Sequence, residues 1–223
     1  MERTNQPDDN TASADPRRGI GEAMNGTRQF NLRSIWEFEA GIDEVAAIAF
    51  DTDTASLWCG DVLMELRTVA APNGFGVGHH VAAHTKGFLP HSFAFSGVTR
   101  RYEPARLMVI DITGDFEGTA TITLDSTGTR TLATFEWSVD CRHRLIRPLT
   151  LIAPNWFAWN HRWAMRRLGE AARREILRRR AGRNAFQVAK PTFPHNIALV
   201  RFISRRLRLP AGGRRIAVEQ RAK

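Results

Sequence analysis

The histidines of this chain are unevenly spread, and imidazole is the side chain best suited to proton transfer or metal binding near neutral pH. Four of the seven, His79, His80, His84 and His91, lie within thirteen residues. The residues around them alternate as in a strand, which would place His80 and His84 on one face but about 13 Å apart. Because one metal ion cannot bridge that distance, we expect outward-facing histidines here and no metal site.

His161 stands in a different setting, on the same face of a helical segment as Met165. A neutral imidazole there could exchange a proton with a carbonyl ligand. Asp111 and Glu117 are its candidate acid or base partners, and turn hydrogen bonding is the alternative role for Asp111. The alternative for His161 is a place at a cavity mouth, bonded to the loop around Asn160 or to the first short helices.

No other motif in the chain carries recognisable chemistry. Cys59 and Cys141 have no paired spacing for zinc, and Arg142 and His143 are the only neighbours that could activate either thiol. The glycine pairs at 76 and 78 and at 212 and 213 lack the spacing and the following Lys-Ser/Thr of a phosphate loop. We therefore expect no disulfide framework, no metal and no cofactor.

Charge divides the chain into two parts. Residues 1–141 hold 11 Lys and Arg against 20 Asp and Glu, whereas residues 142–223 hold 21 against 3. The basic C-terminal part should attract phosphates, anionic lipid or acidic protein surfaces in a salt-dependent way, or form a solvated Arg-rich helix. No base-reading motif accompanies it, so nucleic acid is not the partner we expect.

The pattern of apolar residues predicts the order of elements. Residues 1–33 are polar and predict a disordered leader. A strand is expected over 34–40 and then two short helices. From about residue 62, period-two alternation broken by turn residues predicts six antiparallel strands. A long helix should run from Pro154 to about Arg180 and end at Gly182. The basic extension over 183–223 contains a second helical pattern near 196–209.

Short motifs follow one another in order over residues 34–180. They are Trp36-x-Phe38, Asp53 and Trp58, Gly76-x-Gly78, Lys86-Gly87-Phe88-Leu89-Pro90, Glu103-Pro104, Gly114-Asp115-Phe116-Glu117-Gly118, Thr131 to Trp137, and Trp159-Asn160-His161 with Met165. On these residues the chain resembles the START-like, or SRPBCC, helix-grip superfamily, and most of all its bacterial polyketide cyclase/dehydrase-like branch. The resemblance implies a ligand-binding domain over 34–182 and a cavity for hydrophobic molecules under the last helix.

The expected fold is therefore α+β, a curved antiparallel sheet of about seven strands wrapped around a long C-terminal helix. A sheet that wraps a helix tends to leave an internal cavity, which suits an apolar ligand. The residues expected to line it are apolar, and many are aromatic or Met, which adapt to irregular ligands. They are Phe38, Met64, Phe93, Phe95, Met108, Ile110, Phe116, Trp137 and Met165.

Two functions follow from this reading. The first is binding of a lipid or polyketide-like molecule without transforming it. The second is an enzyme, a polyketide cyclase or dehydratase that uses His161 with Asp111 or Glu117 as cavity acid and base. The resemblance supplies no shared catalytic motif, so fold alone does not choose between them.

The long helix has a second apolar face, formed by Trp156, Trp159 and Trp163 beside Arg166 and Arg167. Soluble monomers seldom leave such a face bare. Of three possible covers for this face we rank the C-terminal extension first, an anionic membrane second and a partner subunit third. With no apolar run long enough for a signal peptide or a spanning helix, the expected location is the cytoplasm, with peripheral membrane contact through the basic part.

Overall fold

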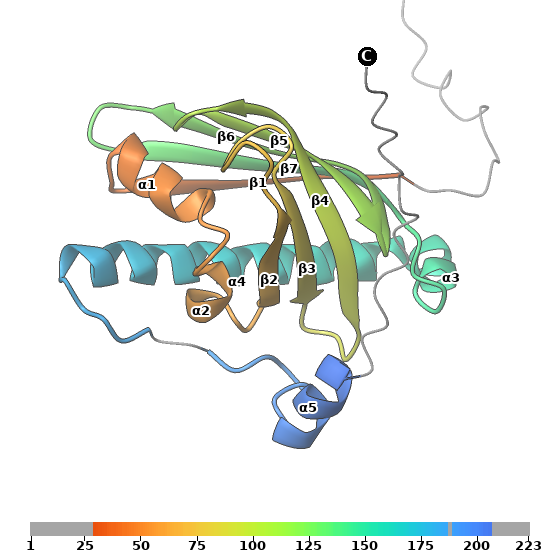
Figure 1. The fold of residues 1–223 in the computed structure, drawn as a ribbon. Helices are drawn as coiled ribbons and strands as arrows, with labels where there is room; N and C mark the ends of the chain where they lie inside the picture. Colours follow the sequence, from red (N-terminus) through yellow and green to blue (C-terminus); the bar gives the residue numbers. More distant parts are fainter. Residues whose placement is uncertain (1–28, 187–188, 207–223) are drawn as a thin grey trace, which may run out of the picture.

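A single seven-stranded antiparallel sheet forms the centre of the computed structural model, which describes residues 29–186 and 189–206 (Figure 1). The strands lie in the order β1-β7-β6-β5-β4-β3-β2, so every strand after β1 pairs with its neighbour in the chain. This confirms the predicted meander. The strands are β1 Gln29–Phe38, β2 Leu63–Ala70, β3 His80–Lys86, β4 Ser92–Glu103, β5 Leu107–Gly114, β6 Phe116–Ser126 and β7 Thr131–Cys141.

Strand β1 begins at Gln29, five residues before the expected start, so the boundary placed after residue 33 is wrong. The alternation of inward side chains continues back to Phe30, which is buried and pairs with Val139 of β7. The polar residues that alternate with these inward side chains made the stretch look like part of a leader, but they face outward and do not interrupt the pairing of β1 with β7. The rest of the expected leader, residues 1–28, lies outside the described residues.

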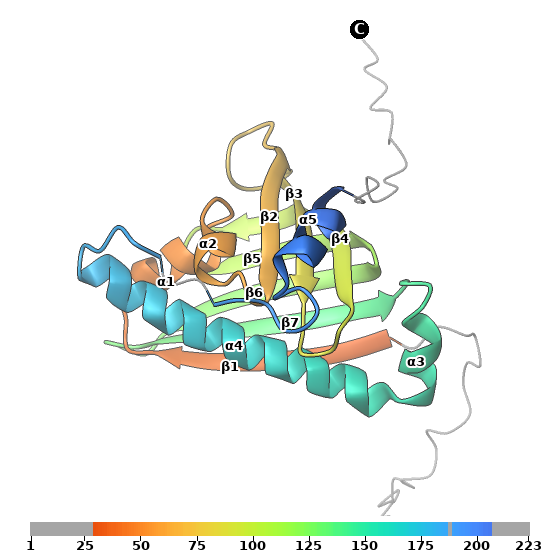
Figure 2. The same ribbon diagram turned by 90° about the horizontal axis from the view of Figure 1, so that it is seen from below.

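Helix α4, Pro154–Arg180, runs the length of the sheet along one face, as the two ribbon views show together (Figures 1 and 2). It begins and ends close to where the sequence predicted. The chain leaves it through Gly182, whose φ of +60° suits a residue without a side chain. Two short helices follow β1, α1 Ile42–Ala49 and α2 Ala55–Trp58, as expected, while α3, Arg147–Ile152, was not predicted.

Small residues on α4 let the helix approach the sheet closely. Ala164, Gly169, Ala171 and Ala172 are all buried on its inner face. A large side chain would hold the helix away from the inward rings of β1 and β7. The result is the helix-grip arrangement, with the long helix held in the concave face of the sheet. No helix of the described residues is long and apolar enough to span a membrane.

The C-terminal extension takes a different path from the one expected. Thr192 donates a hydrogen bond to the carbonyl oxygens of Gly87 and Phe88, at 2.9 and 3.1 Å, which fixes this segment on the β3–β4 loop. Helix α5, Ala198–Arg206, follows it. Trp156 and Trp159 remain 60% and 43% exposed, so the described part of the extension is not the cover of the second apolar face.

Candidate ligand-binding site

Two adjoining cavities lie between the sheet and α4. The first, which we call the helix-pair cavity, has a volume of about 250 Å³ and is bounded by α1 and α2 as well as the sheet. The second, which we call the His161 cavity, has a volume of about 190 Å³ and lies nearer the start of α4. Leu63, Phe95, Phe135, Trp137 and Leu168 belong to the walls of both cavities.

Eight of the nine apolar residues expected to line the interior lie on these walls. Each points inward because it occupies the inner phase of its strand or the inner face of α4. Phe38, Met108 and Ile110 line the helix-pair cavity, whereas Phe93, Phe116 and Met165 line the His161 cavity. Phe95 and Trp137 line both.

Met64 is the exception, and the expectation for it is wrong. The pairing of β2 with β3 shifts register between Leu63 and Glu65, so an irregularity falls at Met64. Such a shift changes which residues of a strand face inward. Leu63 and Leu66, three positions apart, therefore line the helix-pair cavity, and Met64 lines neither cavity.

Several wall residues were missed by reasoning from the sequence. Phe157 belongs to the same helical arc as His161, and Phe135 alternates with Trp137 on β7, so a signal for both was present. Trp36 is two positions from Phe38 and so shares its face of the strand, but it was not counted as a wall residue. The contributions of α1, such as Val45 and Ile48, depend on how that helix closes one end of the interior, which no local pattern reveals.

His161 brings an unsatisfied polar atom to the wall of an apolar cavity. Its Nε2 is buried and makes no hydrogen bond with any described residue. Its ring stacks on Phe135, with centroids 6.4 Å apart and planes 16° apart. Burial, with a smaller contribution from Arg162, lowers the pKa of His161 to about 4. The ring is therefore neutral at physiological pH, with one nitrogen to donate and one to accept.

Asp111 and Glu117 do not lie beside His161, and their assignment as its partners is wrong. Asp111 sits between two inward isoleucines of β5, so it faces outward and pairs with Arg100 at 3.5 Å. Glu117 follows the inward Phe116 and pairs on the outside with Arg142 at 2.8 Å. No carboxylate of the described residues lines the His161 cavity.

Asn160, not His161, ties α4 to the β3–β4 loop. The side chain of Asn160 is buried and its Oδ1 accepts a hydrogen bond from the backbone N–H of Leu89, at 3.1 Å. Gly87 faces the same amide so closely that a Cβ at this position would overlap it. The loop is therefore seated on the helix beside the His161 cavity, and a glycine is required at the contact.

A second group of titratable side chains lies on the outer face of β3, under the extension. Lys86 is 1% exposed and its Nζ donates to the carbonyl oxygen of Leu89. His84 shares a hydrogen bond of 2.9 Å with Ser92, and its ring lies 6.3 Å from that of His195. The expectation of solvent-facing histidines is thus wrong for His84, because the extension covers it.

Burial shifts the titration of this outer group. It lowers the pKa of Lys86 to about 8 and, with the nearby His195, lowers that of His84 to about 4. Among the described residues no set of three or more His, Cys, Asp or Glu lies close enough to hold a metal ion. At physiological pH burial therefore keeps His84 neutral, whereas Lys86 still carries most of its charge.

Two larger hollows flank the last turns of α4, with volumes of about 400 and 330 Å³. Ion pairs line much of both: Arg130 with Glu37 at 2.9 Å in the first, and Arg178 with Glu175 at 2.6 Å in the second. Because charged side chains make up much of both linings, these hollows are less apolar than the two interior cavities.

No family model and no curated protein matches this sequence. Solved structures do match it. The structure is similar to Zhui aromatase/cyclase from Streptomyces, with a TM-score of 0.54 and 11% identity over 70% of this chain and 99% of that chain. It is also similar to a START superfamily protein from Mycobacterium smegmatis, with a TM-score of 0.53 and 13% identity over 66% of this chain and 97% of that chain.

A protein from Thermus thermophilus gives a TM-score of 0.52 with 14% identity, over 64% of this chain and 96% of that chain. At these identities the likeness concerns the fold alone. The chain has the START/SRPBCC-like fold that its sequence motifs predicted.

Proposed function

We propose that this protein binds one small apolar molecule carrying a single hydrogen-bonding group, and that it holds the molecule in the interior without transforming it. The apolar body would occupy the helix-pair cavity and the wall shared with the His161 cavity. Nearly all of that wall consists of aliphatic and aromatic side chains, such as Ile110, Phe135 and Trp137. Burying apolar ligand surface against such a wall is the main source of affinity.

The observation that carries the proposal is the unpartnered Nε2 of His161 on a mostly apolar wall. A buried polar atom without a partner costs free energy, and a ligand hydroxyl or carbonyl that met it would recover that cost. This would fix one end of the ligand against α4. A lipid or a polyketide-like molecule with one oxygen function at its end meets this description.

A second function, catalysis of the aromatase/cyclase type, is favoured by the likeness to Zhui aromatase/cyclase. Of the three acid–base candidates His161 alone faces the cavity, because Asp111 and Glu117 face outward, and the Nζ of Lys86, which also lines this cavity, donates to the Leu89 carbonyl oxygen. With a pKa near 4 the ring could accept a proton transiently but would be a scarce source of protons at neutral pH. The missing partner makes binding the better supported of the two functions.

Filling the cavities one at a time tests the proposal. Ala164 is a wall residue of the His161 cavity and Ala133 is one of the helix-pair cavity. Each is replaced by Phe, and binding of the apolar dye 1-anilinonaphthalene-8-sulfonate is titrated by fluorescence. The expected result is at least tenfold weaker binding in one or both variants, with binding unchanged for Ala71→Phe in an exposed loop.

Equal affinity in all four proteins would contradict the proposal, because the dye would then bind elsewhere. Native mass spectrometry of the full chain from its own host adds the physiological ligand, which should be lost from the same variants. Product formation from a poly-carbonyl substrate that disappears in His161→Ala but persists in Ala71→Phe would instead establish the catalytic function.

A further inference from the structure

Apolar side chains stand exposed together where α3 meets α4. Leu145 and Ile152 are each 82% exposed, and Trp156 is 60% exposed. Phe88 of the β3–β4 loop extends the surface, since its ring lies 5.4 Å from that of Trp159. We call this surface the α3–α4 patch; it consists of Phe88, Leu145, Leu149, Ile152, Trp156 and Trp159.

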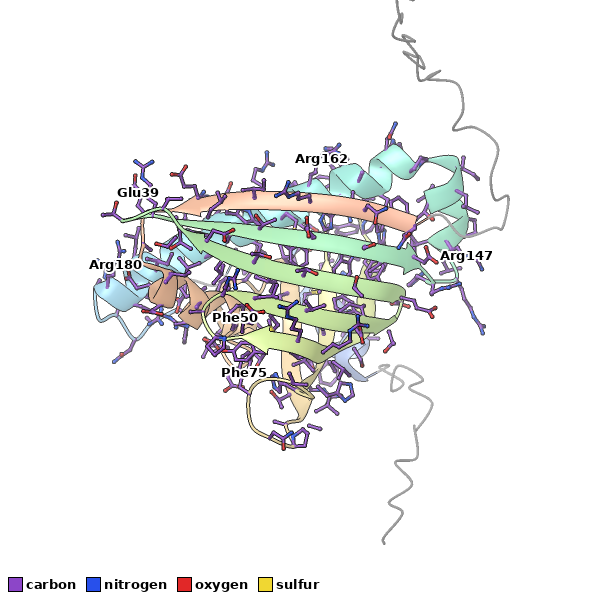
Figure 3. The ribbon with its side chains drawn as sticks, turned by 90° about the horizontal axis from the view of Figure 1, so that it is seen from above. Glu39, Phe50, Phe75, Arg147, Arg162 and Arg180 are labelled. Carbon is purple, nitrogen blue, oxygen red and sulfur yellow. The ribbon has the colours of Figure 1, made fainter. Side chains whose placement is uncertain are left out.

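The patch lies in a basic stretch of the described chain. From Arg142 to Gly169 the sequence holds six arginines and no Asp or Glu. Arg144, Arg162 and Arg166 are exposed and form no ion pair with any described residue. Figure 3 shows Arg162 projecting outward from α4 and Arg147 from the α3 end of the molecule. Arg144 adjoins Leu145 in the chain, and Arg162 and Arg166 lie on α4 with Trp156 and Trp159, so the unpaired charge of these three arginines accompanies the exposed apolar side chains.

The α3–α4 patch also adjoins the interior. A small hollow of about 10 Å³ lies between α3, α4 and the β3–β4 loop, with Leu149 and Trp156 on its walls. Phe157 and Asn160 line both this hollow and the His161 cavity. An apolar molecule crossing the protein surface here would pass between the patch and the cavity along a short path, beside the loop that Asn160 holds.

We propose that the α3–α4 patch docks on the surface of an anionic lipid bilayer, and that the ligand enters and leaves the His161 cavity at this contact. The docking is independent of the proposed function, whereas the passage of a ligand rests on it. Tryptophan rings and aliphatic side chains insert at the level of the lipid headgroups, and arginines beside them meet the lipid phosphates.

The charge around the patch argues against a second copy of the chain as its binding partner. In a two-fold dimer built on it, Arg144, Arg162 and Arg166 of one copy would face the same residues of the other copy, so the interface would bring like charges together. An anionic bilayer supplies the missing negative charge over the whole rim. The contact should therefore weaken as salt is added, because the charges are exposed and screened.

Vesicle sedimentation with the full chain tests the docking. The protein should sediment with phosphatidylcholine vesicles that contain phosphatidylglycerol, and it should remain in solution with pure phosphatidylcholine or in high salt. Replacing Arg144, Arg162 and Arg166 together by Gln should weaken binding roughly a hundredfold, since each arginine near an anionic surface contributes about fivefold.

The matched control removes the same charge elsewhere, from Arg100, Arg101 and Arg106 around the β4–β5 turn. An equal loss of binding in both triple variants would overturn the proposal, because it would reveal attraction by net charge alone. Binding to vesicles that neither triple variant changes would overturn it as well.

The apolar part of the patch has its own test. Ile152→Ser with Trp156→Ser should reduce vesicle binding at least tenfold, whereas Val69→Ser with Val77→Ser, exposed on and near β2, should not. The single variant Ile152→Ser alters a side chain that is almost fully exposed, so it should not destabilise the fold. If the double variant is unstable, vesicle binding by this single variant tests the docking. Unchanged binding in Ile152→Ser and in the double variant would overturn the docking.

Dye titration and sedimentation equilibrium separate the remaining outcomes. The patch variants should keep their affinity for 1-anilinonaphthalene-8-sulfonate while they lose the vesicles. Dye binding in the cavities without vesicle binding would overturn the docking and leave the proposed function standing. Vesicle binding without dye binding in the cavities would support the docking and overturn the proposed function. A wild-type dimer that Ile152→Ser dissociates would assign the patch to a second copy and overturn the proposal.

Discussion

Trp36 of β1 donates its indole N–H to the backbone carbonyl oxygen of Met165 on α4, at 3.1 Å, although the two residues are 129 positions apart. The bond joins the first strand to the long helix. The ring then passes over Gly169, one turn further along α4, where it occupies the space that a Cβ would need. A glycine inside a helix is unfavourable by itself, so its place here reflects this close approach.

Gly169→Ala should therefore destabilise the fold, by roughly 1–3 kcal/mol, because the added methyl group must displace the Trp36 ring. The helix propensity of alanine acts in the opposite direction and would stabilise a helix without this contact. Urea unfolding measures the net effect. A double-mutant cycle with Trp36→Leu supplies the control, since the cost of Gly169→Ala should shrink once the large ring is gone. An unchanged cost would contradict the packing argument.

The alternation of residues along a strand predicts which side chains face inward, except where the pairing of strands is irregular. Met108 and Ile110 were correctly placed inside because residues two apart share a face. The same alternation puts Asp111 on the opposite face, so its assignment to the cavity ignored information that was present. Met64 could not have been placed, because an irregularity of pairing leaves no trace in the pattern of apolar residues of one strand.

Acid should weaken the protein through His161. Its pKa is lowered by burial from 6.5 to about 4, so between these values the unfolded chain binds a proton that the folded chain does not. The free energy of unfolding contributed by this group is complete above pH 6.5 and falls as the pH drops to 4, by up to ~3 kcal/mol.

Urea unfolding across this pH range, compared between wild type and His161→Gln, measures the contribution, since glutamine does not titrate. The acid sensitivity should be smaller in the variant, while His80→Gln, which alters a residue on neither cavity wall, should retain that of the wild type. Carboxylates and His84 also titrate here, but they act in both proteins and cancel in the difference. Parallel curves for wild type and His161→Gln would show that His161 is solvated.

Burial of Lys86 should make the free energy of unfolding depend on pH above neutrality. Burial lowers its pKa from 10.5 to about 8, so the unfolded chain binds more protons between these values and stability should rise with pH across that window. Lys86→Met keeps the buried stem without the charge, and should be as stable as wild type or more stable at neutral pH.

The measurement is the unfolding free energy of wild type minus that of Lys86→Met, which should increase as the pH rises from 8 to 10.5. Burial also raises the pKa of Cys59 to about 12 and so removes stability above pH 9, but it does so in both proteins. Lys190→Met, in an exposed part of the extension, is the control and should show a constant difference. A constant difference for Lys86→Met would mean that its ammonium reaches water.

Trp137 lies on the walls of both cavities and is 7% exposed. Trp137→Ala should cost roughly 3–5 kcal/mol, because the removed ring leaves a void that the rigid sheet cannot fill. Thermal melting gives the comparison with Trp156→Ala, which removes an exposed ring and should leave the midpoint nearly unchanged. Equal midpoints for the two variants would contradict the burial of Trp137.

The contact of Asn160 with the β3–β4 loop should control how fast a ligand leaves. Asn160→Ala removes the acceptor of the Leu89 N–H, and Gly87→Ala forces the same amide away from the loop, so both should loosen the loop beside the His161 cavity. Stopped-flow release of 1-anilinonaphthalene-8-sulfonate should be severalfold faster in both. Asn31→Ala on β1, which removes the acceptor of an exposed hydrogen bond from Ser138 of β7, is the control and should release the dye at the wild-type rate. If both loop variants bind more weakly by slower association alone, the loop does not gate release. Faster release in both would identify this loop as the element that opens the cavity toward the α3–α4 patch.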